Sequence, residues 1–337
     1  MEISKAQTHT RPLPDEPADI AELLSLIQLH EIAVWLLNDY SRNVPCPFWT
    51  DESTWSSKIS PLKFSAVEKA RFLRAFYRLQ TFSNLFGYGE HPLESSEHPY
   101  HNPLHPDFSE FECDEIRRVF FGPFPPWEYE EIGCLWQYCY NRNGKIYTEI
   151  ANDLSKYGST VNASLPDALT DTLLPSAQLC ETDDFGFCEE ERRDCLASLG
   201  PAFLYKLLRA DFMTRRNLLY ANAGRASPYF PHFLPWEFSE QYPLLDPADR
   251  FDFGKDVGGL KTCLSTLTET ERPNVSWDFT WLEQLHPDEP LYEHMYMSGT
   301  NHRRWGWLYT MWDNERLSDW SNKYGAPLRY IGDDYEY

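Results

Sequence analysis

The chain has 337 residues, of which 42% are hydrophobic and 16% aromatic, and its formal net charge at pH 7 is -22. This composition is sufficient for a sizeable hydrophobic core and excludes a chain that is disordered throughout. The negative charge repels phosphate backbones, so it disfavours nucleic-acid binding. A protein with a basic surface is the partner class that the charge favours.

The N-terminal segment, residues 1–18, is polar and contains three prolines, which predicts a flexible arm. It lacks the basic start and the apolar run of a secretory signal. No stretch reaches the roughly 20 apolar residues of a membrane span. We therefore expect an intracellular protein, cytoplasmic or nuclear, with no membrane segment.

The first predicted helix runs from Ile20 to Tyr40, where apolar residues recur at helical spacing. Such a pattern fits an amphipathic or largely buried helix. Pro45 and Pro47 end it, because proline cannot continue a helical hydrogen-bond ladder.

The clearest helix in the sequence lies between Phe64 and Gly87. Ser65 and Glu68 have the spacing of a capping box, in which each side chain binds a free amide of the first turn. Gly87 is a suitable C-terminal stop because glycine adopts positive φ without strain. A wide apolar face follows the cap, formed by Phe72, Leu73, Phe76, Leu79 and Phe82.

A basic stripe accompanies that apolar face, since Arg71, Arg74 and Arg78 recur at spacings of three and four residues. Two interpretations are open. The stripe is either solvated or paired with acidic neighbours, or it is a docking site for an anionic group. In the first case the expected partners are carboxylates such as Glu128, Glu131 or Asp313.

Histidines concentrate in residues 91–107, at His91, His98, His101 and His105. Imidazole is a common metal ligand, so a metal site is one interpretation. Four prolines in the same segment prevent a helix that would align the rings, and no HExxH pattern is present. The sequence favours an exposed loop stiffened by proline.

Further helices are predicted downstream. A capping box at Ser109 and Glu112 opens a helix to about Phe121. Pro126 begins a strong helix that Gly144 separates from a shorter one over 145–157. Residues 158–184 have little apolar periodicity, which suggests a boundary or a long surface insertion. Helical patterns resume at 188–199 and at 202–220, and the polar, acidic tail over 321–337 is expected to lack order.

The segment HRRWGWLYTMWDNERL places Trp305, Leu308, Tyr309 and Trp312 on one predicted helical face. Arginine and tryptophan are enriched where proteins anchor partners, so Arg304, Trp305 and Trp312 are candidates for binding a partner or ligand. The structural alternative is a helix held against the core by its tryptophans, with Asp313 paired to an arginine.

Motifs of catalysis and cofactor binding are absent from the sequence. It contains no GxxxxGK[ST], GxGxxG or GxSxG pattern and no CxxC pair. Cys134 and Cys139 have no histidine nearby in sequence, so burial is expected of them. The sequence therefore predicts no cofactor and no metal, and it leaves the catalytic residues of any enzyme unidentified.

Three blocks of the chain, FLRAFYRLQTFSNLFG, FFGPFPPWEYEEIGCLWQY and HRRWGWLYTMWDNERL, carry a resemblance. In this order they resemble a family of uncharacterised proteins from filamentous fungi, and the resemblance spans roughly Ile20 to Leu317. It implies a fungal intracellular source and a helical fold, and it brings no activity, cofactor or catalytic residue.

Taken together, these patterns predict a mostly α-helical single domain over residues 19–320, with irregular long loops and little or no sheet. Two functions remain. The first is a non-enzymatic interaction or regulatory protein, which should expose one contiguous apolar or aromatic patch rimmed by polar residues. The alternative is an enzyme whose active site lies between helices and uses Asp, Glu, His or Arg.

Overall fold

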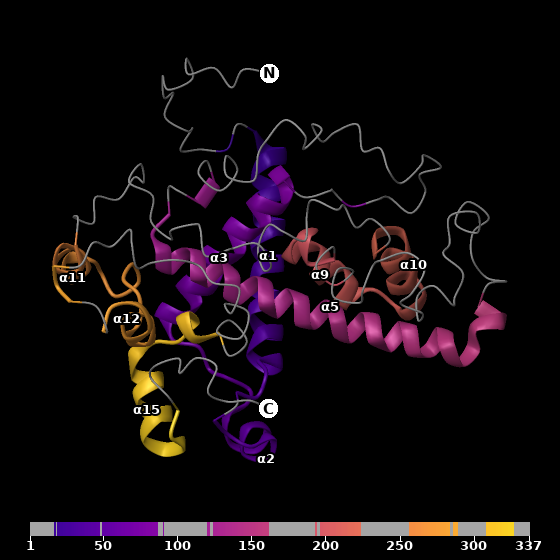
Figure 1. Cartoon of the computed structure of the whole chain (residues 1–337). Coiled ribbons are helices and arrows are strands. Elements are labelled where there is room, and N and C mark those ends of the chain that lie inside the picture. Colours follow the sequence, from indigo (N-terminus) through magenta and orange to yellow (C-terminus); the bar gives the residue numbers. More distant parts are fainter. Residues whose placement is uncertain are drawn as a thin grey trace.

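The computed structural model describes residues 17, 19–47, 49–86, 90, 120–121, 124–161, 193, 196–223, 256–283, 286–288 and 308–326. For residues 151–161, 220 and 223 it describes the backbone alone. Within these ranges the protein is mostly α-helical and contains no strand, as the sequence predicted. The long helix α5 crosses α1 and α3, with α9 and α10 beside it and α11, α12 and α15 near its other end (Figure 1).

Helix α1 spans Ile20–Asn43. Asp19 caps its N-terminus, because its side chain accepts a hydrogen bond of 2.8 Å from the amide of Glu22. The C-terminal half is buried through Ala33, Leu36 and Tyr40 and packs against α3 and α9. The predicted helix is therefore present, and only half of it belongs to the core.

After Pro47 the chain turns through α2 (Glu52–Thr54) and a π-helical turn (Trp55–Ile59). Trp55 is buried and its indole nitrogen donates to the carbonyl of Val44, at 3.1 Å. This bond ties the turn back to the end of α1.

Helix α3 spans Ala66–Phe86 and lies at the centre of the fold, against α1, α5 and α9. The predicted capping box is confirmed. The amide of Ser65 donates to Glu68 at 2.9 Å, and the amide of Glu68 donates to the Ser65 hydroxyl at 3.2 Å. Four of the five apolar residues predicted for the buried face are fully buried, namely Phe72, Phe76, Leu79 and Phe82.

Helix α5 spans Pro126–Val161 without interruption, so the predicted break at Gly144 is wrong. Gly144 lies inside the helix, where a Cβ atom would stand 2.9 Å from Nε of Arg193. The missing side chain thus permits the close approach of Arg193. Gly144 is therefore explained by the space that Arg193 occupies, and it does not end a helix.

The single helix predicted over 202–220 is two helices, α9 (Pro201–Arg209) and α10 (Phe212–Ala223). Asp211 separates them, because its carboxylate accepts from the amide of Thr214 at 3.1 Å and so caps a new helix. The break turns Phe212 outward, and its side chain is 39% exposed.

Two short helices follow, α11 (Val257–Thr266) and α12 (Val275–Trp281), capped by Asp256 and Asn274. The helices predicted from the sequence did not include α11. Trp277 of α12 packs edge-on against Trp127 of α5, with ring centroids 5.6 Å apart. This contact anchors α12 to the long helix.

The predicted helical face around Trp312 is wrong in its secondary structure. Leu308 has positive φ, a single 3-10 turn spans Tyr309–Met311, and Trp312 is extended. Asp313 then caps α15 (Asn314–Tyr324), accepting from the amide of Arg316 at 2.7 Å. The helix continues past residue 320, where the tail was predicted to begin, and Gly325 ends it in the left-handed conformation.

Several predictions fall outside the described residues. These are the N-terminal arm apart from residue 17, the histidine-rich segment 91–107, the capping box at Ser109, most of the insertion over 158–184, and the tail from residue 327. Arg304 and Trp305 lie outside them as well.

Candidate functional site

The arginine stripe of α3 lies in the interface with α5. Arg74 binds Glu131 through two bonds, with Nη2 2.6 Å from Oε1 and Nε 2.9 Å from Oε2. Arg78 pairs with Glu128. Arg71 is 2% exposed, and its Nε lies 3.8 Å from Oε1 of Glu131. The predicted pairing of the arginines with Glu128 and Glu131 is therefore confirmed.

The same arginines also bind backbone carbonyls of distant segments. Arg71 donates to the carbonyls of Trp312 and of Arg272, and Arg74 donates to that of Thr270 at 2.9 Å. Burial lowers the pKa of Arg71 and raises that of Glu131, while the mutual attraction of the two charges opposes both shifts. These groups hold α3, α5 and the 270–272 turn together. Their position supports the structural interpretation, since each of the three guanidinium groups forms an ion pair with a carboxylate of α5.

Asp313 has a different role from the predicted one, because it caps α15. The carboxylate that reaches across is Glu68, which accepts from Arg316 at 2.5 Å and 2.8 Å and from the amide of Asp313 at 3.2 Å. One glutamate thus closes the capping box of α3 and holds α15. The sequence signal for the capping box was clear, whereas nothing in it indicated the partner about 250 residues away.

Trp312 was a candidate for anchoring a partner, and its ring is 1% exposed. It packs among Tyr40, Phe64 and Trp320, with centroid distances of 6.3, 6.3 and 5.2 Å. A partner cannot contact a ring in this position. The aromatic cluster supports the structural alternative for Trp312, and Arg304 and Trp305 lie outside the described residues.

Buried thiols near these groups are unsuited to nucleophilic chemistry. Cys134 and Cys139 are fully buried on α5, as predicted. Burial raises the pKa of both thiols well above their ordinary value, so neither forms a thiolate near pH 7. In the part of the chain that the structure describes, no group of three His, Cys, Asp or Glu side chains could hold a metal ion.

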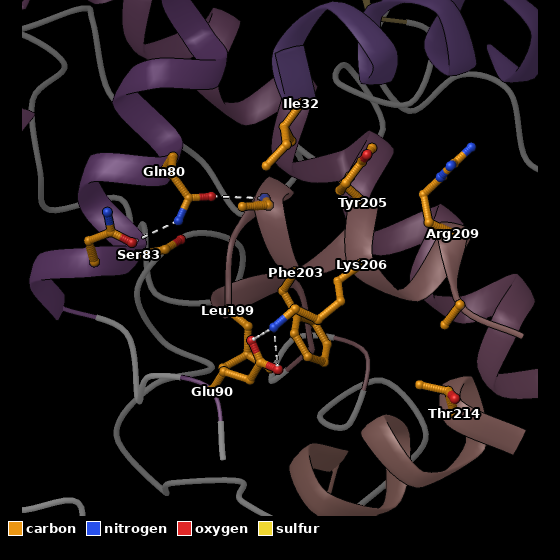
Figure 2. Close-up of a pocket in the computed structure, with 13 residues that line it drawn as sticks. Ile32, Gln80, Ser83, Glu90, Leu199, Phe203, Tyr205, Lys206, Arg209 and Thr214 are labelled. Atoms are coloured by element: carbon orange, nitrogen blue, oxygen red, sulfur yellow. Dashed lines mark hydrogen bonds and ion pairs between the residues drawn. The ribbon is translucent and has the colours of Figure 1, made fainter. Parts of the chain in front are cut away.

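A cavity of about 710 Å³ opens between α1, α3, α9 and the start of α10. Figure 2 shows Gln80 and Ser83 at one side of it and Arg209 and Thr214 at the other, with Phe203 between them. Lys206 binds Glu90 across the opening, at 2.5 Å. The sequence contained no signal for this site, because its walls come from segments more than a hundred residues apart.

The second exposed feature is the apolar segment of α1, which we define as residues 20–29. Five of its six large aliphatic side chains are between 45% and 76% exposed, namely Ile20, Leu23, Leu24, Leu26 and Ile27. The sixth, Leu29, packs against the core. Four of these residues, Ile20, Leu23, Leu24 and Ile27, lie along one face of the helix, and Leu26 lies beside it. A helix buried on one side would show the same pattern. Sequence periodicity therefore could not distinguish burial from exposure in this segment.

Among the described helices, α1 is the one long and apolar enough to cross a membrane by length and composition. The sequence had predicted no such stretch. Only 17% of its most apolar window is buried. The C-terminal half packs into the core through Leu36 and Tyr40, so most of the exposed aliphatic side chains of α1 lie in the apolar segment, with Val34 at 40% exposure beyond it.

Comparison with known proteins finds no matching family model, no similar curated protein and no similar solved structure. The likeness to the filamentous-fungal family therefore stays a prediction.

Proposed function

We propose that this chain is a non-enzymatic, intracellular interaction protein that inserts the apolar segment of α1 into an apolar groove on a partner protein with a basic surface. The observation behind the proposal is the exposure of Ile20, Leu24 and Ile27, at 76%, 53% and 47%. Proteins rarely expose so many large aliphatic groups together unless a partner covers them.

The spacing of these residues fits one known mode of recognition. Ile20, Leu23, Leu24 and Ile27 occupy positions i, i+3, i+4 and i+7 of the helix. Helices that bind in grooves present their anchors at these positions. The N-cap of Asp19 and the packing of the C-terminal half hold the helix formed before binding. A preformed helix loses less conformational entropy when it binds.

Charge favours a basic rim around the partner's groove. The helix carries Glu22 and Glu31 and no lysine or arginine before Arg42, and Asp19 adds a further carboxylate at its start. The chain as a whole has a net charge of -22. A groove bordered by lysine or arginine complements these charges and accelerates association.

The enzymatic alternative would place converging titratable groups in the cavity. Lys206 and Glu90 do converge there, but their side chains are 52% and 30% exposed and bind each other. Tyr40, Tyr138 and Cys134, whose pKa values burial raises, lie in the core and not along the cavity. The geometry therefore favours the interaction protein over the enzyme.

The experiment is affinity capture of the tagged chain from its native cell extract, compared with Ile27→Glu and with Leu85→Glu. Both variants add one carboxylate at an exposed aliphatic position, and Leu85 on α3 is 55% exposed. We expect one stoichiometric protein to copurify with the parent and with Leu85→Glu, and to be lost with Ile27→Glu.

The captured protein should be released as salt is raised, because the basic rim contributes through charge. Two results would contradict the proposal. One is a partner retained equally by both variants. The other is the absence of a protein partner together with binding to neutral lipid vesicles that Ile27→Glu abolishes, which would assign the segment to a membrane surface.

A further inference from the structure

The cavity between α1, α3 and α9 has the size and lining of a small-molecule site and is separate from the proposed docking segment. Its volume of about 710 Å³ falls within the roughly 300–1,000 Å³ of ligand pockets. Its apolar walls come from Ile32, Leu199, Phe203 and Ala210. Such walls fit a flat or extended apolar body.

One end of the cavity is polar and held in position. The carbonyl oxygen of Gln80 accepts from the amide of Ala202 at 2.9 Å, and its amide donates to Asn84 at 2.7 Å. Ser83 beside it is 4% exposed, and its hydroxyl has no hydrogen-bond partner among the described residues. A buried hydroxyl without a partner is unfavourable, and a ligand hydroxyl at this end would satisfy it.

The other end is cationic. Lys206 is paired with Glu90, whereas the exposed Arg209 has no ion pair or hydrogen bond within the described part of the chain. Both cations lie in the last turn of α9, where the helix dipole favours positive charge. The helix dipole explains why cations occur there. It occupies none of the hydrogen-bond donors of Arg209, so the guanidinium is available to a carboxylate.

We propose that this cavity binds a small carboxylic acid that has an apolar ring or chain and a hydroxyl at the opposite end. The carboxylate pairs with Arg209 at the rim, the apolar body lies against Phe203 and Ile32, and the hydroxyl binds Ser83 and Gln80. The separation of Ser83 from Arg209 across the cavity (Figure 2) sets this order of groups. In a chain of net charge -22, two cations beside one carboxylate favour an anion locally.

The test uses three probes: 6-hydroxy-2-naphthoic acid, 2-naphthoic acid, which lacks the hydroxyl, and methyl 6-hydroxy-2-naphthoate, which lacks the charge. Affinity for the full chain is measured by isothermal titration. We expect one saturable site that prefers the hydroxy acid. The parent is compared with Arg209→Gln, Ser83→Ala and Arg42→Gln, the last removing an exposed arginine that does not line the cavity.

Arg209→Gln is expected to weaken binding of the hydroxy acid about fivefold and to leave binding of the ester unchanged. Arg42→Gln should leave the affinity for both probes unchanged. Ser83→Ala should weaken binding of the hydroxy acid about fivefold and leave the affinity for 2-naphthoic acid unchanged. Ile27→Glu should bind all probes as the parent does, which separates this site from the exposed segment of α1. Absence of saturable binding, or equal affinities in Arg209→Gln and Arg42→Gln, would overturn the proposal.

Discussion

Arg74 and Glu131 form a two-bond ion pair between α3 and α5, with nitrogen–oxygen distances of 2.6 and 2.9 Å and the carboxylate almost fully buried. The main contribution of this ion pair is to constrain how α3 packs against α5. Removing Glu131 leaves the buried Arg71 without its ion pair and leaves Arg74 paired with Glu128 alone. Unpaired charge that stays buried costs more than the pair contributes.

Glu131→Gln should therefore lower the free energy of unfolding by roughly 3–5 kcal/mol. Chemical denaturation monitored by tryptophan fluorescence measures this change. Asp319→Asn is the matched control, because Asp319 pairs with Lys323 on the exposed side of α15. The control should leave the midpoint nearly unchanged, and equal losses in the two variants would be inconsistent with a buried constraint.

Glu68→Gln should loosen α15 without unfolding the protein. Glu68 holds Arg316 through two charged bonds, each of which weakens when the carboxylate becomes an amide. We expect a loss of about 2 kcal/mol, with faster amide hydrogen exchange in α15 than in α1. Uniform acceleration across both helices would show that Glu68 acts on the whole fold.

Gly200→Ala should be more costly than Gly325→Ala, although both glycines have positive φ, +86 and +71. A Cβ at Gly200 would lie 2.8 Å from Oγ of Ser83, whereas one at Gly325 meets nothing within 4 Å. In addition, φ and ψ at Gly200 lie in a region that other residues hardly adopt. We expect Gly200→Ala to lower the free energy of unfolding by on the order of 3 kcal/mol and Gly325→Ala to lower it by about 1 kcal/mol. Thermal denaturation measures both, and equal midpoints in the two variants would contradict this difference.

Asp278 should make stability depend on pH between about 4 and 6. Burial raises the pKa of its carboxyl from 3.8 to about 6, and its Oδ1 has no partner among the described residues. The folded state therefore keeps a proton that the unfolded state has released. The stabilisation is complete below the unfolded pKa and is lost as pH rises through the folded pKa.

Asp278→Asn stays uncharged, so it should flatten this part of the profile and raise stability at pH 7 by up to roughly 3 kcal/mol. Denaturation at several values between pH 4 and 8 measures the effect. Asp288→Asn, at an exposed position, controls for the loss of one negative charge. If the stability of the parent instead rose steadily from pH 4 to 8, and if Asp278→Asn abolished that rise, the sign assigned to Asp278 would be wrong.

The sequence located helices best where their ends carry local chemical signals. Pro45 and Pro47 mark the end of α1, and the box of Ser65 and Glu68 starts α3. Gly144 misled the prediction because a glycine needed for packing looks the same in sequence as one that ends a helix. Asp211 was overlooked because the apolar period continues through it.

The candidate sites were harder to predict than the helices. Pairing of the arginine stripe with Glu128 and Glu131 followed from charge and helical spacing, and it proved structural. The cavity depends on which distant helices meet, and no local pattern records that. Exposure of the segment that includes Ile27 is likewise a tertiary property, since the same residues would suit a buried helix.

The proposed docking of α1 is tested most directly by placing a photo-crosslinking amino acid, p-benzoylphenylalanine, at Leu24 and separately at Leu85. Both positions are exposed aliphatic sites, at 53% and 55%. In native extract, we expect one reproducible crosslinked protein at position 24 that is absent at position 85 and is lost when Ile27→Glu is added. The same crosslinked proteins at both positions, or none at position 24, would contradict it.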